Sequence, residues 1–202
     1  MGDANRRCWE RRLPLPSIRT RTRIRIHIRT CAGEPRPMAD SMDLILWRHA
    51  EAADAAPGMD DLSRVLTGRG ERQAREMAHW LDRHLPRDTR VLVSPAVRTR
   101  QTVQDLRRKV VSSDALAPKR DVRALLEAAG WAEATAPVMV VGHQPTLGLA
   151  LAHLVGGVPL DRLADTTPWR LRKGGVWWLR CERDARDRPG VLVVAVRSPD
   201  LP

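Results

Sequence analysis

Three short apolar runs, each followed at once by polar residues, constrain the fold of this chain more than any other feature of its sequence. They are DLILW at 43–47, RVLVS at 90–94 and PVMVVGH at 137–143. Each run has the length and the apolar content of a buried strand. Segments in which apolar residues recur at helical spacing follow the runs. This alternation with short connections predicts an α/β fold, a three-layer α/β/α sandwich around a mostly parallel central sheet.

The predicted helices have recognisable starts. Thr67 suits the N-cap of the first helix, and Pro95 suits the first turn of the helix after the second strand. Helices are predicted over 70–85, 121–131 and 145–157, and paired late strands over 174–182 and 190–196.

Length and cysteine usage narrow the class of protein. A chain of 202 residues suits one domain with a sizeable core. No apolar run approaches the ~20 residues of a membrane-spanning helix, so no span is expected. The cysteines at 8, 31 and 181 are scattered and lack CxxC spacing. We therefore expect reduced thiols and a cytoplasmic protein.

The first 41 residues differ from the rest, which predicts a domain over 42–202 preceded by a basic arm. Residues 1–41 hold ten Arg and four acidic residues, a net charge of +6 out of +11 for the chain. They contain no apolar stretch of the secretory type. The alternating RIRIHIR at 23–29 could form a strand, but we favour a disordered arm, or upstream sequence before a true start at Met38 or Met42.

The positive charge alone does not indicate a nucleic-acid partner. Of the 35 basic residues 32 are Arg, a skew typical of GC-rich coding sequence. Tyr and Phe are absent, so only Trp could stack on bases. Nucleic-acid binding is therefore disfavoured.

Polar side chains follow three of the predicted strands. The signatures are WRHAE at 47–51, SPAVRTRQT at 94–102 and VGHQP at 141–145. Ligands of open α/β sheets bind outside the carboxyl ends of the strands. If these strands are central neighbours, their side chains converge on one pocket, and a loop could add Arg64. The converging side chains are Arg48, His49, Arg98 and His143.

Several guanidiniums around two imidazoles favour an anion over a cation. Zinc sites need Cys, His or carboxylate ligands without fixed positive charge beside them, so neither a metal nor another cofactor is expected. Arg side chains bind phosphoryl oxygens bidentately and neutralise their charge during transfer. An imidazole nitrogen in line with phosphorus can act as the nucleophile. Neighbouring Arg charge should lower the pKa of that imidazole and keep it neutral at pH 7.

The signatures together resemble those of a known family. LWRHAE resembles the RHG motif of the histidine phosphatase (phosphoglycerate mutase-like) superfamily. SPAVRTRQT and VGHQPTLG look closest to its SixA-type phosphohistidine phosphatases, and the resemblance extends over about 42–197. It implies a phosphoglycerate mutase-like fold and a phosphatase, a hydrolase without cofactors that functions in signal transduction.

The resemblance also implies roles for individual residues. His49 would be the nucleophile and would form a phosphohistidine intermediate, while the phosphoryl group would be bound by Arg48, Arg98 and His143. Arg64 matches an Arg that binds substrate before the family's PLT sequence, although Val65 replaces the usual Pro. Ala50 replaces the Gly of the RHG motif.

One departure bears on the substrate. SixA-type proteins often show ELTPxGD where this chain has DALAPKRD at 114–121, so Ala115 stands where the acidic residue is expected. Asp114 or Asp121 remains as a candidate proton donor. Loss of a donor would hamper expulsion of an alkoxide, whereas an imidazole leaves readily once protonated. Ser94, in contrast, is expected to cap the following helix.

Three functions fit these observations. The favoured one is dephosphorylation of a histidine on a phosphotransfer or phosphotransferase-system protein. The second is a phosphomonoesterase acting on a small phosphorylated metabolite in the same pocket. The third is a non-catalytic phosphate-recognition module or a basic nucleic-acid binder.

Overall fold

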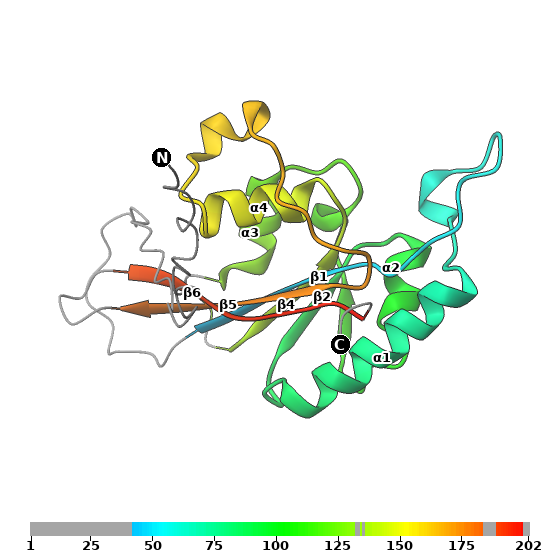
Figure 1. Ribbon diagram of the computed structural model, residues 1–202, viewed down its shortest axis with the longest axis horizontal. Helices are drawn as coiled ribbons and strands as arrows, with labels where there is room; N and C mark the ends of the chain where they lie inside the picture. The colour runs from blue at the N-terminus through cyan, green and yellow to red at the C-terminus, as the bar shows by residue number, and fades with distance from the viewer. Residues whose placement is uncertain (1–41, 132–133, 135, 184–188, 200–202) are drawn as a thin grey trace, which may run out of the picture.

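The computed structural model describes residues 42–131, 134, 136–183 and 189–199 (Figure 1). The predicted basic arm over 1–41 lies outside the described residues. None of the helices described is both long enough and apolar enough to cross a membrane.

One six-stranded sheet forms the centre of the domain, in the order β3-β2-β4-β1-β5-β6. Its first four strands run parallel, whereas β5 is antiparallel to both of its neighbours. The strands are β1 (Met42–Arg48), β2 (Arg90–Val93), β3 (Val110–Ser112), β4 (Val138–Gly142), β5 (Val176–Arg183) and β6 (Pro189–Arg197).

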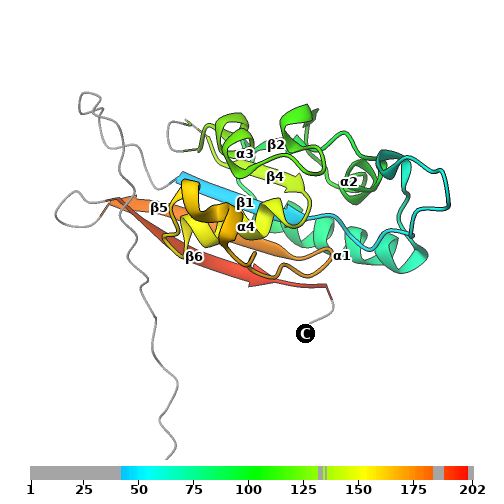
Figure 2. The same ribbon diagram turned by 90° about the horizontal axis from the view of Figure 1, so that it is seen from above.

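Helices cover both faces of this sheet (Figures 1 and 2). In Figure 1, α3 and α4 lie above the sheet and α1 below it. The helices are α1 (Gly68–His84), α2 (Val97–Thr102), α3 (Val122–Ala129) and α4 (Thr146–Leu154), with 3-10 helices η1 (Asp61–Ser63), η2 (Asp114–Leu116) and η4 (Leu160–Asp165). The predicted three-layer architecture is confirmed.

The central strand β1 shows why two helical layers are needed. Leu44 and Leu46 pack into the core beneath α3 and α4. Ile45 and Trp47 pack on the opposite face, against α1. All four side chains are fully buried, so a strand in this position must be apolar on both faces.

The predicted elements are found, with shifts at their ends: Pro95 precedes α2 by two residues and does not lie in its first turn. Thr67 is the N-cap of α1, where its hydroxyl accepts from the Gly70 N–H. The paired late strands are β5 and β6. The edge strand β3 was not predicted, because it has only three residues and two of them are exposed.

The strand order brings the three polar signatures together. β4 lies between β1 and β2, with Arg48 beside Gly142 and Val93 beside Val141. The three strands therefore end side by side, as predicted.

Candidate active site

His49 follows the last residue of β1 and is almost fully buried. Its Nδ1 lies 2.7 Å from the carbonyl oxygen of Ala50. Because a carbonyl oxygen only accepts, Nδ1 of the neutral ring carries the proton. The Nε2 lone pair is then left as the nucleophilic atom of this side chain.

His143 follows β4 and faces His49, with 5.1 Å between the ring centroids. Its Nε2 lies 2.7 Å from the hydroxyl of Ser94, which follows β2 and is fully buried. Ser94 is not the N-cap of α2, a position that Ala96 takes, but its hydroxyl accepts from the Ala96 N–H at 3.4 Å. A Ser94 hydroxyl that donates to Nε2 would place the proton of neutral His143 on Nδ1.

Burial and positive charge keep both imidazoles neutral at pH 7. Burial is the largest cause that lowers the pKa of His49 to about 4. The hydrogen bond with Ala50, the next largest, opposes it, and the charges of Arg98, Arg48 and Lys173 lower the pKa further. Burial and the charges of neighbouring groups lower the pKa of His143 to about 3. The sequence predicted this direction from the Arg charges, but burial is the larger cause.

Arg98 lies in the first turn of α2 and is 4% exposed. Its Nη2 lies 2.8 Å from Oδ2 of Asp61, and its Nη1 donates to the Asp61 backbone carbonyl. Burial alone would raise the pKa of Asp61, but hydrogen bonds from Arg98 and Arg64 outweigh it and lower the pKa. Sequence reasoning missed Asp61, because nothing in the sequence shows that the loop after β1 folds back over α2.

Arg64 lies in this same loop. Its Nη1 lies 3.1 Å from Oδ1 of Asp61, and its Nε donates to the carbonyl of Ala53. Asp61 therefore bridges the guanidiniums of Arg64 and Arg98.

Arg48 is held by a segment that the sequence did not predict to be in the site. Its Nη1 donates to the carbonyl of Leu171 (2.6 Å), and the Gly174 N–H donates to the carbonyl of His49 (3.0 Å). The exposed Arg170 and Lys173 belong to this segment, and their charges lower the pKa of Arg48 and His49, respectively. Burial is the larger cause in both cases. The run RLRK at 170–173 was the available signal.

The second glycine of the VGHQPTLG sequence, Gly148, explains how this segment reaches the site. Gly148 in α4 accepts a hydrogen bond from the Trp169 N–H. A Cβ at Gly148 would lie 2.2 Å from the Trp169 carbonyl oxygen, so no larger residue fits. Ala50 is fully buried, and its backbone N–H donates to the Thr102 hydroxyl.

Three buried nitrogen atoms at the site have no hydrogen-bond partner among the residues that the structure describes. They are Nε of Arg48, Nε of Arg98 and Nδ1 of His143. Each of these nitrogens is a donor if His143 has the tautomer assigned above. Such donors suit an anion, since an unpaired buried donor is costly. In the described part of the chain, no three His, Cys, Asp or Glu side chains form a cluster able to hold a metal ion.

The two aspartates considered as proton donors lie elsewhere. The Asp121 carboxylate caps α3 by accepting from the Ala124 N–H. Asp114 is an exposed residue in η2. Neither is among the groups whose charge acts on His49 or His143, whereas Asp61 acts on His143.

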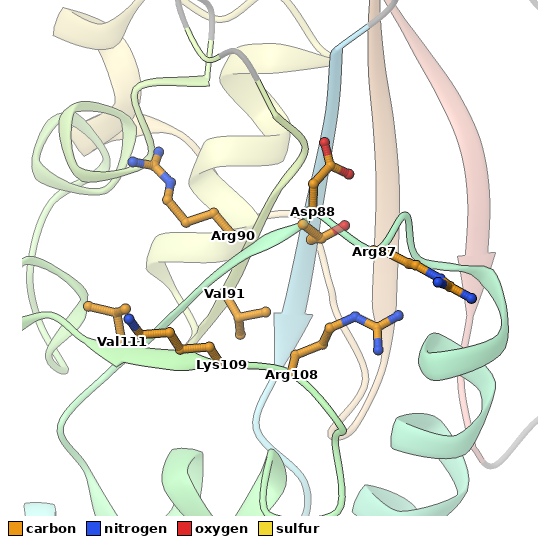
Figure 3. Close-up of a pocket in the computed structure, with 8 residues that line it drawn as sticks. Arg87, Asp88, Arg90, Val91, Arg108, Lys109 and Val111 are labelled. Atoms are coloured by element: carbon orange, nitrogen blue, oxygen red, sulfur yellow. The ribbon is translucent and has the colours of Figure 1, made fainter.

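A second cavity, of about 390 Å³, lies at the opposite end of the sheet (Figure 3). Its cationic lining residues are Arg87, Arg90, Arg108 and Lys109. In Figure 3 the heads of Arg90 and Lys109 point to one side and those of Arg87 and Arg108 to the other. No imidazole lines this cavity.

Comparison with known proteins gives consistent results. Residues 44–117 match the model of the histidine phosphatase superfamily (branch 1). Phosphohistidine phosphatase SixA of Escherichia coli K12 is 35% identical over 126 residues, 57% of this chain and 76% of that protein.

Two solved structures of SixA proteins share the fold. One, from Nakamurella multipartitia, is 30% identical with a TM-score of 0.64 and covers 81% of this chain and 99% of its own. The other, a protein histidine phosphatase SixA complexed with tungstate, is 28% identical with a TM-score of 0.58 and covers 78% and 97%.

Proposed function

Because the chain belongs to the histidine phosphatase superfamily and is a phosphatase of the SixA type, we propose that it removes the phosphoryl group from phosphohistidine on a partner protein. His49 is the proposed nucleophile, and the reaction passes through a phosphohistidine on this residue. Arg48, Arg64, Arg98 and His143 are the proposed ligands of the phosphoryl oxygens.

In the first step the Nε2 lone pair of His49 forms a bond to phosphorus. The P–N bond of the substrate breaks, and its electron pair goes to the substrate imidazole, which takes a proton from solvent. The hydrogen bond from Nδ1 to Ala50 supports this role by holding the ring with Nε2 free. Water then attacks the phosphorus and loses a proton to solvent, the P–Nε2 bond breaks with its electron pair returning to His49, and inorganic phosphate is released.

The protonation state of the Asp61 carboxyl is the observation that favours a substrate with a P–N bond. Asp61 is the carboxylate whose charge acts on His143, and two guanidiniums lower its pKa. An ionised carboxylate has no proton to give an alkoxide leaving group, which needs one in the transition state. Phosphohistidine escapes this requirement, since its imidazole leaves neutral after protonation from solvent.

The surface around the pocket supports a protein substrate with an acidic face. The exposed residues Arg170, Arg172 and Lys173 lie in the segment that holds Arg48, so positive charge lies on this side of the pocket. Such charge accelerates association with an acidic partner. A phosphotransfer or phosphotransferase-system protein is the class of partner we propose.

The proposal is tested by measuring kcat/KM on phosphohistidine and phosphoserine peptides of the same sequence. We expect the phosphohistidine peptide to be preferred by about 10²-fold or more, the range that a missing general acid produces. Ala115→Glu, which restores the family's acidic residue, should raise the rate on phosphoserine selectively. Glu127→Gln, an exposed acidic residue in α3, serves as a control and should change neither rate.

Comparable rates of the unaltered protein on both peptides would contradict the proposal. They would favour the alternative, a phosphomonoesterase acting on a small phosphorylated metabolite.

A further inference from the structure

The guanidinium of Arg98 is already occupied by an anion that belongs to the protein. Its Nη2 binds the Asp61 carboxylate at 2.8 Å, and its Nη1 binds the Asp61 carbonyl. The other carboxylate oxygen of Asp61 binds Arg64 at 3.1 Å. A phosphoryl group that binds the two N–H groups facing Asp61 must displace this residue, because each N–H makes one strong hydrogen bond.

The position of Asp61 in the fold allows this replacement. It begins η1, a single 3-10 turn in which no residue is buried. The base of the loop is fixed, because Ala52 pairs with Leu66 and the Ala53 N–H donates to the Val65 carbonyl. Arg98, by contrast, is buried within α2. Displacement therefore moves η1 and leaves the arginine in place.

A pocket of this charge needs some means of releasing its product. The charges of Arg48 and Arg98 act on both histidines, which are neutral, and Asp61 is the carboxylate whose charge acts on His143, so Asp61 opposes an incoming dianion. Inorganic phosphate would stay bound to such a set of donors.

We propose that Asp61 is an internal competitor for the phosphate-binding donors of Arg98 and Arg64. Its carboxylate holds both guanidiniums while the pocket is empty, yields them to the phosphoryl group of the substrate, and recaptures them as inorganic phosphate leaves. Asp61 is thus a positioning residue that sets the affinity for product. The inference rests on the proposed function only in taking this pocket as the phosphoryl site.

Equilibrium binding of inorganic phosphate to the full chain tests the inference without requiring turnover. Calorimetry should show that Asp61→Asn binds phosphate about tenfold more tightly than the unaltered protein. Asp54→Asn is the matched control: its exposed carboxylate lies 3.7 Å from Arg64 but does not contact Arg98. This control should change the Kd less than twofold.

Turnover provides a second readout. Product inhibition by phosphate should become stronger in Asp61→Asn, with the Ki falling in parallel with the Kd. A melting temperature within a few degrees of that of the unaltered protein would show that the variant is folded.

An unchanged or higher Kd in Asp61→Asn, or no phosphate binding by either protein, would overturn the inference. So would a fall in kcat without a change in Kd, which would make Asp61 a proton donor. Failure of the proposed function has a separate signature: phosphate binding that responds to Asp61→Asn in a protein that does not hydrolyse phosphohistidine.

Discussion

The two ends of the parallel sheet carry similar numbers of cationic side chains but use them differently. At the carboxyl end, Nε atoms of Arg48 and Arg98 are buried without a partner among the described residues, beside two neutral imidazoles. At the amino end, Arg90 donates to the Ala129 carbonyl, and Arg108 donates to the Leu85 carbonyl and pairs with Asp82. The Nε of Arg108 is also buried without a partner among the described residues, but no imidazole lines the cavity beside it. The heads there diverge (Figure 3).

The difference shows that positive charge by itself does not make an anion site. Arginines whose donors are used on backbone carbonyls tie helices to the sheet. Arginines that keep buried donors around a nucleophile can bind a phosphoryl group. A count of basic residues does not separate the two ends, whereas the direction of each side chain does.

The sharpest test of this comparison replaces a histidine at each end. His49→Ala should lower kcat by about 10⁴ or more, because no other side chain can take the phosphoryl group. His84→Ala, at the end of α1 that leads to the amino end of the sheet, should leave kcat unchanged. Trapping with labelled substrate should give an acid-labile phosphoenzyme in the unaltered protein and in His84→Ala. A phosphoenzyme in His49→Ala would refute the assignment.

The next largest effect is expected from replacing one arginine at each end. Arg98→Ala should lower kcat/KM by about 10²–10³, the usual effect of removing a donor to transition-state charge. Arg108→Ala should keep kcat/KM within about twofold but lower the melting temperature by several degrees, because it loses its contacts with Asp82 and Leu85. Equal losses of activity in both variants would remove the distinction between the two ends.

The sequence predicted the residues that follow the strands at the carboxyl end of the sheet, but not the groups that reach this site through loops. Arg48, His49 and His143 follow directly from apolar strands, so their positions depend only on strand order. Asp61 and the segment around Leu171 reach the site through loops, and their contacts depend on tertiary packing such as that at Gly148. Ser94 was assigned a local role because a hydroxyl before a helix suits a cap, whereas strand order brings it to His143.

Neutral buried histidines at the carboxyl end should also appear in the pH dependence of stability. Burial is the main cause that lowers the pKa of His49 in the folded state to about 4, below its ordinary value of 6.5. The unfolded chain therefore binds more protons between these values, so the free energy of unfolding falls as pH decreases from 6.5 toward 4.

His49→Ala should remove part of this decrease in the free energy of unfolding at low pH. Between pH 7 and pH 5 the free energy of unfolding should decrease by about 1–2 kcal/mol less in the variant than in the unaltered protein. Urea denaturation at both pH values measures the difference. Parallel decreases would mean that His49 titrates near its ordinary pKa.

The smallest effect is expected from removing residues 1–41, the third basic region of the sequence. Its net charge is +6, and it contains none of the side chains proposed to bind phosphate. The strand that follows it, β1, is paired on one side with β4 and on the other with β5. The core strand thus has no open edge for an added strand to fill, and only β3 and β6 lie at edges. A chain starting at Met42 should therefore keep its melting temperature within about 1 °C, below the ~2–4 °C that loss of one ~1 kcal/mol contact produces in a domain of this size. Its specific activity should stay within about twofold.

A large drop in melting temperature would instead identify RIRIHIR at 23–29 as a strand of the sheet, added at one of those two edges.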